Sequence, residues 1–378
     1  MTKVIVATRE TSSIPEFAGN TWVPLNYMLG LQRLGIESYW VDRIGPVDPW
    51  SGSHSLDYLV SAFHHTACQF GFEDRYCIVY DAGARFFGMD EDKLRTLVSD
   101  VDAVLNIGGH MESNSLLMDV RRRAFVDVDP GFTQIWAHQG KLAIEQHSHF
   151  FTVGQNVGKP EFAIPSGNVE WHIIVPPVVL SQWYSTIEER SERFSTIADW
   201  RGSQEAIFRE TYFGGKREEF IRFLRVPSDA GLWIEIALCI DQRDYEDLGL
   251  LLSHNWRVRD PYQCAGDPRS YLEFIQYSRA EFSVAKRGYL RSRSGWISDR
   301  TVCYLASGKP AVVQSTGFED SIPVGEGLLT FGTPEQAVTA IQEVNRNYLQ
   351  HCHAARRIAE ERFNSDIVLS AILERIGL

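Results

Sequence analysis

Short apolar runs alternate with helix-like segments from the first residues of the chain onward. Lys3–Ala7 has the composition of a buried strand, and apolar residues recur at helical spacing over 22–34 until Gly35 ends the run. A second apolar run, 38–41, follows directly. This order of strand, helix, glycine and strand predicts a βαβ unit, which builds a parallel sheet covered by helices.

The same alternation continues along both halves of the chain. In the first half, further strands are predicted at 76–80, 103–107 and 123–128. In the second half, strands are predicted at 232–240, 281–285 and 311–313, with helices at 216–224, 271–278 and 333–349 and a helical C-terminus. No GxGxxG follows the first strand, which argues against a dinucleotide-dependent dehydrogenase.

A Pro-Pro pair at 176–177 interrupts the alternation and predicts a domain boundary. A chain of 378 residues has room for two domains of ordinary size, each with its own core. We therefore predict an N-terminal α/β domain over 1–180, a C-terminal α/β domain over 181–352 and closing helices over 353–378. Ligands of such folds bind in a cleft, outside the carboxyl ends of the strands.

Charge and composition argue against several classes of protein. The formal net charge is −12 and the pI is about 5.4, so broad binding to nucleic acid or to anionic membranes is disfavoured. The start of the chain lacks a signal-peptide pattern, and the most apolar stretch, 172–180, is too short for a membrane span. The six cysteines show no CxxC spacing, which favours reduced thiols in the cytoplasm. We expect no metal site, because the adjacent residues His351, Cys352 and His353 point in different directions on a helix.

Residues 293–319 carry the most specific local pattern. A small-residue turn, Ser294-Gly295-Trp296, precedes Ser298, which is well placed as the N-cap of an apolar helix that ends at Gly308. Free backbone N–H groups at the start of such a helix, fronted by Ser and Gly, form a site for an anion such as a diphosphate. An ordinary, well-capped βα crossover explains the same pattern equally well.

This segment resembles the donor-binding stretch of GT-B glycosyltransferases, in which a Gly-rich turn and a helix N-terminus hold the diphosphate of a nucleotide sugar. Residues 306–311, Ala-Ser-Gly-Lys-Pro-Ala, are similar to the small-Gly-x-Pro-Val turn that ends the helix in that family. Residues 294–298 are similar to the Cys-Gly-Trp-Asn-Ser part of the plant-type signature. The resemblance to the donor domain of glycosyltransferase families 1 and 4 covers about thirty residues.

The resemblance implies the GT-B fold, in which two Rossmann-like α/β/α domains face each other across a cleft and the C-terminal helix crosses back to the first. It also implies a diphosphate held by protein cations and helix N-termini, usually without a bound metal. The sequence departs from the family at two places. The glutamate pair of many retaining members would fall near Gly295 and Cys303, and the opening histidine of the plant-type signature is Arg293 here. The stereochemical outcome is therefore not carried over.

The predicted donor site combines this loop with cations at strand ends. Lys216 and Arg217 follow a Gly-Gly turn, and Lys286 comes just before the loop, although solvated surface charge is the usual role of such side chains. The carboxylate of Asp299, in the first turn, interacts favourably with the helix dipole with or without a ligand. It would repel a diphosphate unless it turned toward ribose hydroxyls or Arg300. The full set of predicted donor contacts is Lys216, Arg217, Lys286, Ser294, Gly295, Trp296, Ser298, Asp299, Arg300 and Glu319. The last corresponds by resemblance to an acidic residue that contacts the sugar.

Candidates for a catalytic base lie in the first half. Asp127 and Asp129 share one face at the end of an apolar strand, and two neighbouring carboxylates can raise the pKa of one of them. Asp129 before Pro and Gly is equally consistent with ordinary turn chemistry. His110, after a Gly-Gly pair, is a further candidate, although a lone histidine is more often structural.

The predicted activity is that of a hexosyltransferase, which moves a sugar from a nucleoside-diphosphate sugar to a small-molecule or glycan acceptor. We expect no cofactor, no nucleic-acid partner and no integral membrane segment, and homodimerisation stays open. One alternative is a nucleotide-sugar epimerase of the same fold, and another is a non-catalytic module that binds a nucleotide or sugar. The sugar, the base, the acceptor and the anomeric outcome depend on the geometry of a few loop side chains.

Overall fold

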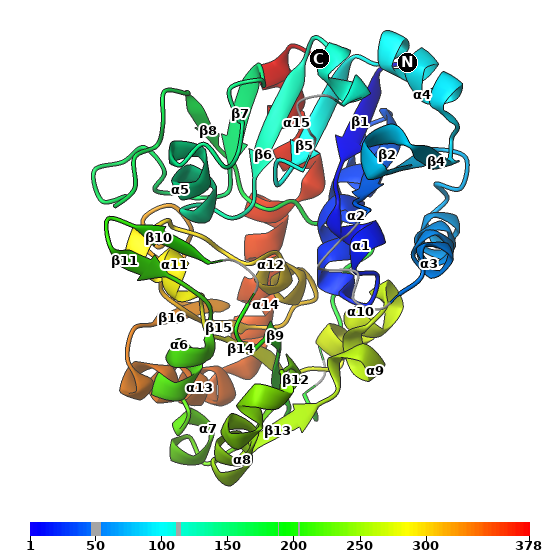
Figure 1. The fold of residues 1–378 in the computed structure, drawn as a ribbon. Helices are drawn as coiled ribbons and strands as arrows, with labels where there is room; N and C mark the ends of the chain where they lie inside the picture. Colours follow the sequence, from blue (N-terminus) through cyan, green and yellow to red (C-terminus); the bar gives the residue numbers. More distant parts are fainter. Residues whose placement is uncertain (47–53, 111–114, 188, 203–204) are drawn as a thin grey trace.

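The computed structural model describes residues 1–46, 54–110, 115–187, 189–202 and 205–378. Figure 1 shows two α/β domains, one above the other, each built around its own sheet. The first domain has an eight-stranded sheet of order β4-β3-β2-β1-β5-β6-β7-β8. Its strands are β1 (Lys3–Ala7), β2 (Glu37–Ile44), β3 (Tyr76–Tyr80), β4 (Arg85–Gly88), β5 (Ala103–Ile107), β6 (Arg123–Asp127), β7 (His149–Thr152) and β8 (Trp171–Ile173). Neighbours run parallel except for β4, which is antiparallel to β3.

The second domain has a six-stranded parallel sheet of order β13-β12-β9-β14-β15-β16. Its strands are β9 (Phe194–Asp199), β12 (Ile234–Cys239), β13 (Trp256–Arg259), β14 (Ala280–Ser283), β15 (Ala311–Gln314) and β16 (Leu328–Phe331). A separate antiparallel hairpin consists of β10 (Ala206–Phe208) and β11 (Thr211–Phe213).

Helices connect the strands in both domains. Those of the first domain are α1 (Glu10–Ser13), α2 (Ala18–Arg33), α3 (Leu56–Gln69), η1 (Asp81–Gly83), α4 (Glu91–Asp100), η2 (Leu116–Asp119) and α5 (Phe132–His138). Those of the second are α6 (Arg217–Arg222), α7 (Val226–Asp229), η3 (Gln242–Asp244), α8 (Tyr245–Ser253), α9 (Pro261–Ala265), α10 (Pro268–Gln276), α11 (Arg287–Ser292), α12 (Asp299–Ala306) and α13 (Pro334–Arg346). Polar N-caps start several of them: Asp267, Ser298 and Thr333 each accept a hydrogen bond from a backbone N–H of the first turn.

The C-terminal helices return to the first domain. α14 (Tyr348–Ile358), η4 (Ala359–Phe363) and α15 (Ser365–Ile376) run from the second domain up behind the first, in orange to red in Figure 1. α15 packs on α2, where a Cβ built on Gly30 would lie 2.4 Å from Leu369 Cδ1. Val178 and Phe363–Ser365 are joined by backbone hydrogen bonds. The predicted fold class, including this return, is confirmed.

The predicted strands and helices lie close to observed ones, but some observed strands were not predicted, among them β9 and β13. Trp256 lies outside the strands and helices that the sequence predicts. It is instead the first residue of β13, is 2% exposed, and donates from its indole N–H to Leu224 O at 2.8 Å. The first sheet ends at Ile173 and the second begins at Phe194, so the predicted boundary near residue 180 falls between them.

Two apolar clusters cross from one domain to the other. One packs Trp22 of α2 with Trp183 of the connecting segment and Tyr271 of α10. The other packs Phe132 of α5 with Phe208 of β10 and with residues of α11. Because both clusters draw on the two domains, part of the core of each domain is completed by the other.

A turn after β7 also docks on the second domain. Gln155 N donates to Gly295 O at 3.3 Å, and Asn156 N donates to Ser294 O at 3.1 Å. The side-chain amide of Asn156 donates to Arg293 O at 3.0 Å and to Gly317 O at 2.8 Å. These bonds hold the turn against two loops of the second domain.

Candidate functional site

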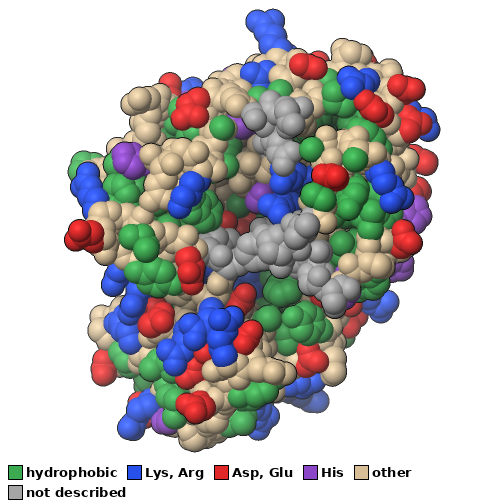
Figure 2. All heavy atoms as spheres, in the orientation of Figure 1, with side chains coloured by type: hydrophobic (Ala, Val, Ile, Leu, Met, Phe, Trp, Pro, Cys, Tyr) green, Lys and Arg blue, Asp and Glu red, His purple; other side chains and the backbone are tan. Residues whose placement is uncertain are grey.

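A cleft of about 580 Å³ lies between the two domains. Its walls come from the segments that follow β1, β5 and β6 in the first sheet and β9, β12 and β14 in the second. In each sheet the strand order reverses at one place, between β1 and β5 and between β9 and β14. Ligands of α/β sheets bind at such points. Figure 2 shows the surface hollowed between the two halves, with basic, acidic and histidine side chains around the opening.

Lys216 is a buried cation in the wall of this cleft. It is the N-cap residue of α6 and is 7% exposed. Among the described residues, no hydrogen bond or ion pair reaches its ammonium group. Burial lowers the pKa of Lys216 well below its ordinary value, and the nearby Arg300 and Lys286 lower it further, while Asp199 and Glu281 oppose that shift. A buried charge without a counterion is costly, so this position favours an anionic ligand.

Gly215 is needed to place this lysine. A Cβ built on Gly215 would lie 1.3 Å from Arg201 O, so only glycine lets the two backbone segments meet. Lys216 N donates to the same carbonyl at 3.1 Å. The segment that precedes α6 is thereby fastened to the segment that follows β9.

Lys286 and Asp129 face each other across the cleft from opposite domains. Lys286 Nζ lies 3.8 Å from Asp129 Oδ1 and sits over the rings of Phe132 and Tyr289. The hydroxyl of Tyr289 also donates a hydrogen bond to Asp129. Tyr289 stacks on Trp296, with ring centroids 4.1 Å apart. Asp129, Lys286, Tyr289 and Trp296 all line the cleft.

The start of α12 points into the same cleft. Ser298 caps the helix by accepting a hydrogen bond from Arg300 N at 3.2 Å. The guanidinium of Arg300 donates to Glu281 at 2.8 Å, to Ile197 O at 2.6 Å and to Ser283 Oγ at 2.6 Å. Ser298, Asp299 and Arg300 all line the cleft. Burial raises the pKa of Asp299 to about 7, and the nearby carboxylate of Asp129 contributes.

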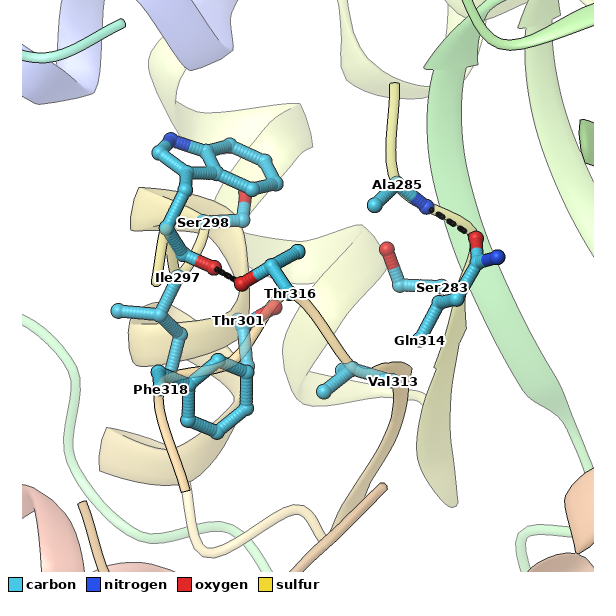
Figure 3. A pocket seen from close by; sticks show the side chains of 10 residues that line it. Ser283, Ala285, Ile297, Ser298, Thr301, Val313, Gln314, Thr316 and Phe318 are labelled. Carbon is cyan, nitrogen blue, oxygen red and sulfur yellow. Dashed lines mark hydrogen bonds between the residues drawn. The ribbon is translucent and has the colours of Figure 1, made fainter. Parts of the chain in front are cut away.

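A second, much smaller cavity, of about 10 Å³, lies behind the loop that leads into α12. Figure 3 shows Ser298, Thr301 and Thr316 close together on one side of it, and Ser283 and Gln314 on the other. Thr316 donates from its hydroxyl to Trp296 O at 2.6 Å, and Gln314 accepts from Ala285 N at 3.0 Å. These bonds hold the loop before α12 and the segment after β14 on the side that faces the small cavity.

The first half of the predicted diphosphate loop faces away from the cleft. Ser294 is fully buried and Gly295 lies against the turn after β7, with φ +69° and a Cβ position 2.9 Å from Gln155 Cβ. Neither residue lines the cleft. Glycine at 295 is explained by this close approach and by its left-handed backbone.

We expect Gly295→Ala to destabilise the protein by about 1–3 kcal/mol, because the new methyl group meets Gln155 and the backbone is left-handed. Urea unfolding would measure this. Gly249→Ala, in α8 with nothing within 4 Å of the Cβ position, is the control and should leave stability equal or slightly higher. Equal stability of the Gly295→Ala protein and its parent would contradict the role assigned to this contact.

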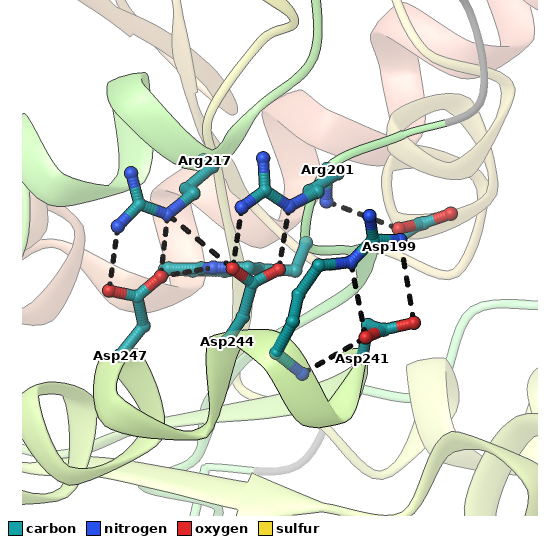
Figure 4. Close-up of polar contacts among 8 residues, drawn as sticks. Asp199, Arg201, Arg217, Asp241, Asp244 and Asp247 are labelled. Atoms are coloured by element: carbon teal, nitrogen blue, oxygen red, sulfur yellow. Dashed lines mark hydrogen bonds and ion pairs between the residues drawn. The ribbon is translucent and has the colours of Figure 1, made fainter.

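Three further predicted residues lie outside the cleft lining. Arg217 donates to both carboxylate oxygens of Asp247, at 2.6 and 2.9 Å, within the ion-pair network of Figure 4. Asp127 is fully buried and accepts hydrogen bonds from Thr133, Gln134 and Thr152. Burial raises the pKa of Asp127 to about 6. Glu319 is half-buried in a turn and is also absent from the lining.

His110 reaches the cleft from the first domain. Its backbone carbonyl accepts a hydrogen bond from Arg43 at 3.2 Å, and its ring lies over Gly108, where a Cβ would come within 2.8 Å of Nε2. The cleft therefore brings together His110 and Asp129 from the first domain with the predicted donor residues Lys216, Lys286, Trp296, Ser298, Asp299 and Arg300 from the second.

Several lining residues had no distinctive sequence signal. Tyr289 was not among the predicted site residues, yet it joins the two domains through Asp129. Asp199 ends β9, a strand that the sequence pattern did not predict, and accepts hydrogen bonds from Arg201 N and Gly202 N. If this strand had been predicted, an acidic residue at its carboxyl end would have made Asp199 a candidate site residue.

The described residues contain no group of three or more His, Cys, Asp or Glu side chains that could hold a metal ion. Within the same part of the chain, no helix combines the length and the apolar character that a membrane span requires.

No family model matches the chain, and no curated protein matches it. Solved structures do resemble it over their whole length. An alpha-glucosyltransferase in complex with UDP-glucose and DNA containing an abasic site has a TM-score of 0.63 at 13% identity, covering 100% of this chain and 99% of its own. AviGT4, a glycosyltransferase involved in avilamycin A biosynthesis, has a TM-score of 0.60 at 14% identity, covering 100% and 97%. Alr3699/HepE from Anabaena, in complex with UDP and glucose, has a TM-score of 0.60 at 12% identity, covering 100% of both chains. At these identities the similarity shows the fold, which is GT-B, as the sequence resemblance implied.

Proposed function

We propose that the protein is a glycosyltransferase that takes a sugar from a nucleoside-diphosphate sugar bound in the cleft between its domains. The diphosphate lies beside Lys216 and Lys286 and at the N-terminus of α12, where Ser298 starts the helix. This proposal uses the GT-B fold, the position of the cleft at both strand-order reversals, and the chemistry of these three groups.

The observation that carries the proposal is the buried ammonium of Lys216, which has no hydrogen bond or ion pair among the described residues. A leaving diphosphate needs positive charge that is already in place. Lys286 adds a second cation whose counterion, Asp129, is 3.8 Å away. The helix N-terminus contributes backbone N–H groups that point toward the same space.

The acceptor side of the cleft belongs to the first domain. His110 and Asp129 are the groups there that could take a proton from an acceptor hydroxyl. Asp127 is not included, because its carboxylate is enclosed by hydrogen bonds that fix the start of α5. We propose a small molecule or a glycan as acceptor, since a net charge of −12 disfavours a polyanion.

Titration calorimetry with UDP, GDP, TDP and ADP tests the donor site first. We expect one of them to bind, and UDP is the first choice because UDP is present in solved neighbours of the same fold. Turnover is then followed with the matching nucleotide sugar and a panel of acceptors, including a DNA duplex as the polyanionic control. Binding of none of the four nucleotides would contradict the proposal.

The same assay separates the alternatives. An epimerase converts the nucleotide sugar without any acceptor, so product analysis after incubation with donor alone detects it. A binding module retains nucleotide affinity but shows no turnover with any acceptor. A transferase needs both substrates.

We expect EDTA to leave the transferase activity unchanged. In the proposed site, the leaving diphosphate is stabilised by Lys216, Lys286 and the N-terminus of α12, and not by a bound metal ion. Initial rates with and without an excess of EDTA would measure this. Loss of activity that manganese restores would contradict metal independence.

A further inference from the structure

Asp299 is an acidic residue within the proposed diphosphate site. It is the first residue of α12, it lines the cleft with Lys216, Lys286 and Arg300, and it is half-buried. A carboxylate there would repel a diphosphate at close range. Arg300 favours the charged form of Asp299, but only weakly.

Two cations of the cleft have other partners. Arg300 is committed to Glu281, Ile197 O and Ser283, and Lys286 lies against Asp129. No hydrogen bond or ion pair from another described residue reaches the Asp299 carboxyl group. The acid therefore shares the cleft with three cations and forms no ion pair with a described residue.

The groups that face Asp299 are mostly neutral or negative. They are Tyr27 on α2, Asp129 after β6, Tyr289 on α11, and Arg300 and Cys303 on α12 itself. Tyr27 is 1% exposed, and among the described residues its hydroxyl has no hydrogen-bond partner, so an uncharged phenol lies on this side of the acid. These surroundings disfavour a carboxylate.

We propose that Asp299 binds the donor as a neutral carboxylic acid, taking one proton from the solution and donating it in a hydrogen bond to a diphosphate oxygen. This inference rests on the proposed function of the cleft. A carboxylic acid that stays protonated near neutral pH is a strong donor to an anionic oxygen. The acid then contributes to anion binding, and the repulsion disappears.

The pH dependence follows from the direction of the shift. Burial, and then Asp129, raise the pKa of Asp299 to about 7, so the side chain is neutral below that pH and ionised above it. Affinity for the donor is therefore highest at pH 6 and falls by about tenfold by pH 8. At pH 8, binding takes up close to one proton at this residue.

Calorimetry with UDP-glucose tests this, because its diphosphate has no proton to gain or lose between pH 6 and 8. The binding enthalpy is measured at pH 8 in two buffers of different ionisation enthalpy, which gives the number of protons taken up. We expect close to one proton for the parent and none for Asp299→Asn, whose affinity should also become independent of pH. Asp199→Asn, which changes another carboxylate of the same cleft, is the matched control and should keep the uptake.

The outcomes separate the two proposals. Binding of UDP-glucose without proton uptake overturns the role of Asp299 and leaves the donor site standing. Uptake that persists in Asp299→Asn also overturns it and assigns the proton to another group of the cleft, such as Lys216, whose pKa burial lowers, or His110. If the parent does not bind UDP-glucose but binds another nucleotide, the proton uptake is measured with the sugar conjugate of that nucleotide, and the same outcomes decide. If no nucleotide binds, both proposals fail.

Discussion

Replacing Lys216 with methionine is expected to weaken UDP binding by about 10- to 100-fold and to leave the protein at least as stable as its parent. The charge-assisted contact to the diphosphate is lost, while methionine keeps most of the apolar length of the side chain. Stability should not fall, because the ammonium is buried without an ion pair among the described residues. Calorimetry and urea unfolding measure the two effects.

Arg217→Met is the matched control, since it removes the adjacent cation. Arg217 is bound to both oxygens of Asp247 outside the cleft, so UDP affinity should be unchanged. Stability should fall by about 1 kcal/mol, because the pair is partly exposed. If both variants bound UDP as tightly as the parent, the diphosphate would have to lie elsewhere.

Arg300→Met is expected to destabilise the protein by about 3–5 kcal/mol. Glu281 is fully buried, and Arg300 is the partner that compensates its charge, with 2.8 Å between Nε and Oε1. Without the guanidinium, the carboxylate loses its counterion, and Ile197 O and Ser283 each lose a donor. Urea unfolding of the variant and its parent gives the difference in free energy.

The double variant Arg300→Met, Glu281→Gln is the control for this effect. It removes both charges of the pair, so it should recover a large part of the lost stability. Equal stability of the double and single variants would show that the cost comes from packing or from the carbonyl of Ile197. A single variant as stable as the parent would contradict the buried pair altogether.

Much of the fold could be predicted because the signals for it are local. Strands such as Tyr76–Tyr80 and Ala103–Ile107 are short apolar runs bounded by polar residues, and the structure has them with the same limits. The helix after Ser298 was marked by a cap at one end and Gly308 at the other. The strand that begins at Trp256 was not predicted, because a strand of four residues, in which only alternate side chains are buried, has almost no pattern of its own.

The site was harder to predict, because it depends on which neighbour a side chain meets. Lys216 and Arg217 look alike in sequence, yet one enters the cleft and the other turns to Asp247. The difference arises because Asp247, on α8, pairs with Arg217, and α8 is distant from both residues in the chain. Asp127 and Asp129 do not share a strand face as predicted, because β6 ends at Asp127 and Asp129 lies in the bend after it. The hydroxyls of Thr133 and Thr152 enclose Asp127, whereas Asp129 lines the cleft. Whether Asp129, His110 and the donor residues act as proposed stays a prediction.

The turn after β7 bears on how this protein could be recombined with others. Gln155 and Asn156 belong to the first domain in sequence, but their backbone N–H groups and the side-chain amide of Asn156 donate to carbonyls of residues 293–295 and 317 in the second. A chimera made by exchanging whole domains at residue 180 would separate these partners and would also divide the two shared apolar clusters. A workable hybrid must transfer the turn and its receiving loops together. The segments that must be exchanged together are thus the two contacting surfaces at the domain interface, and not one sheet with its helices.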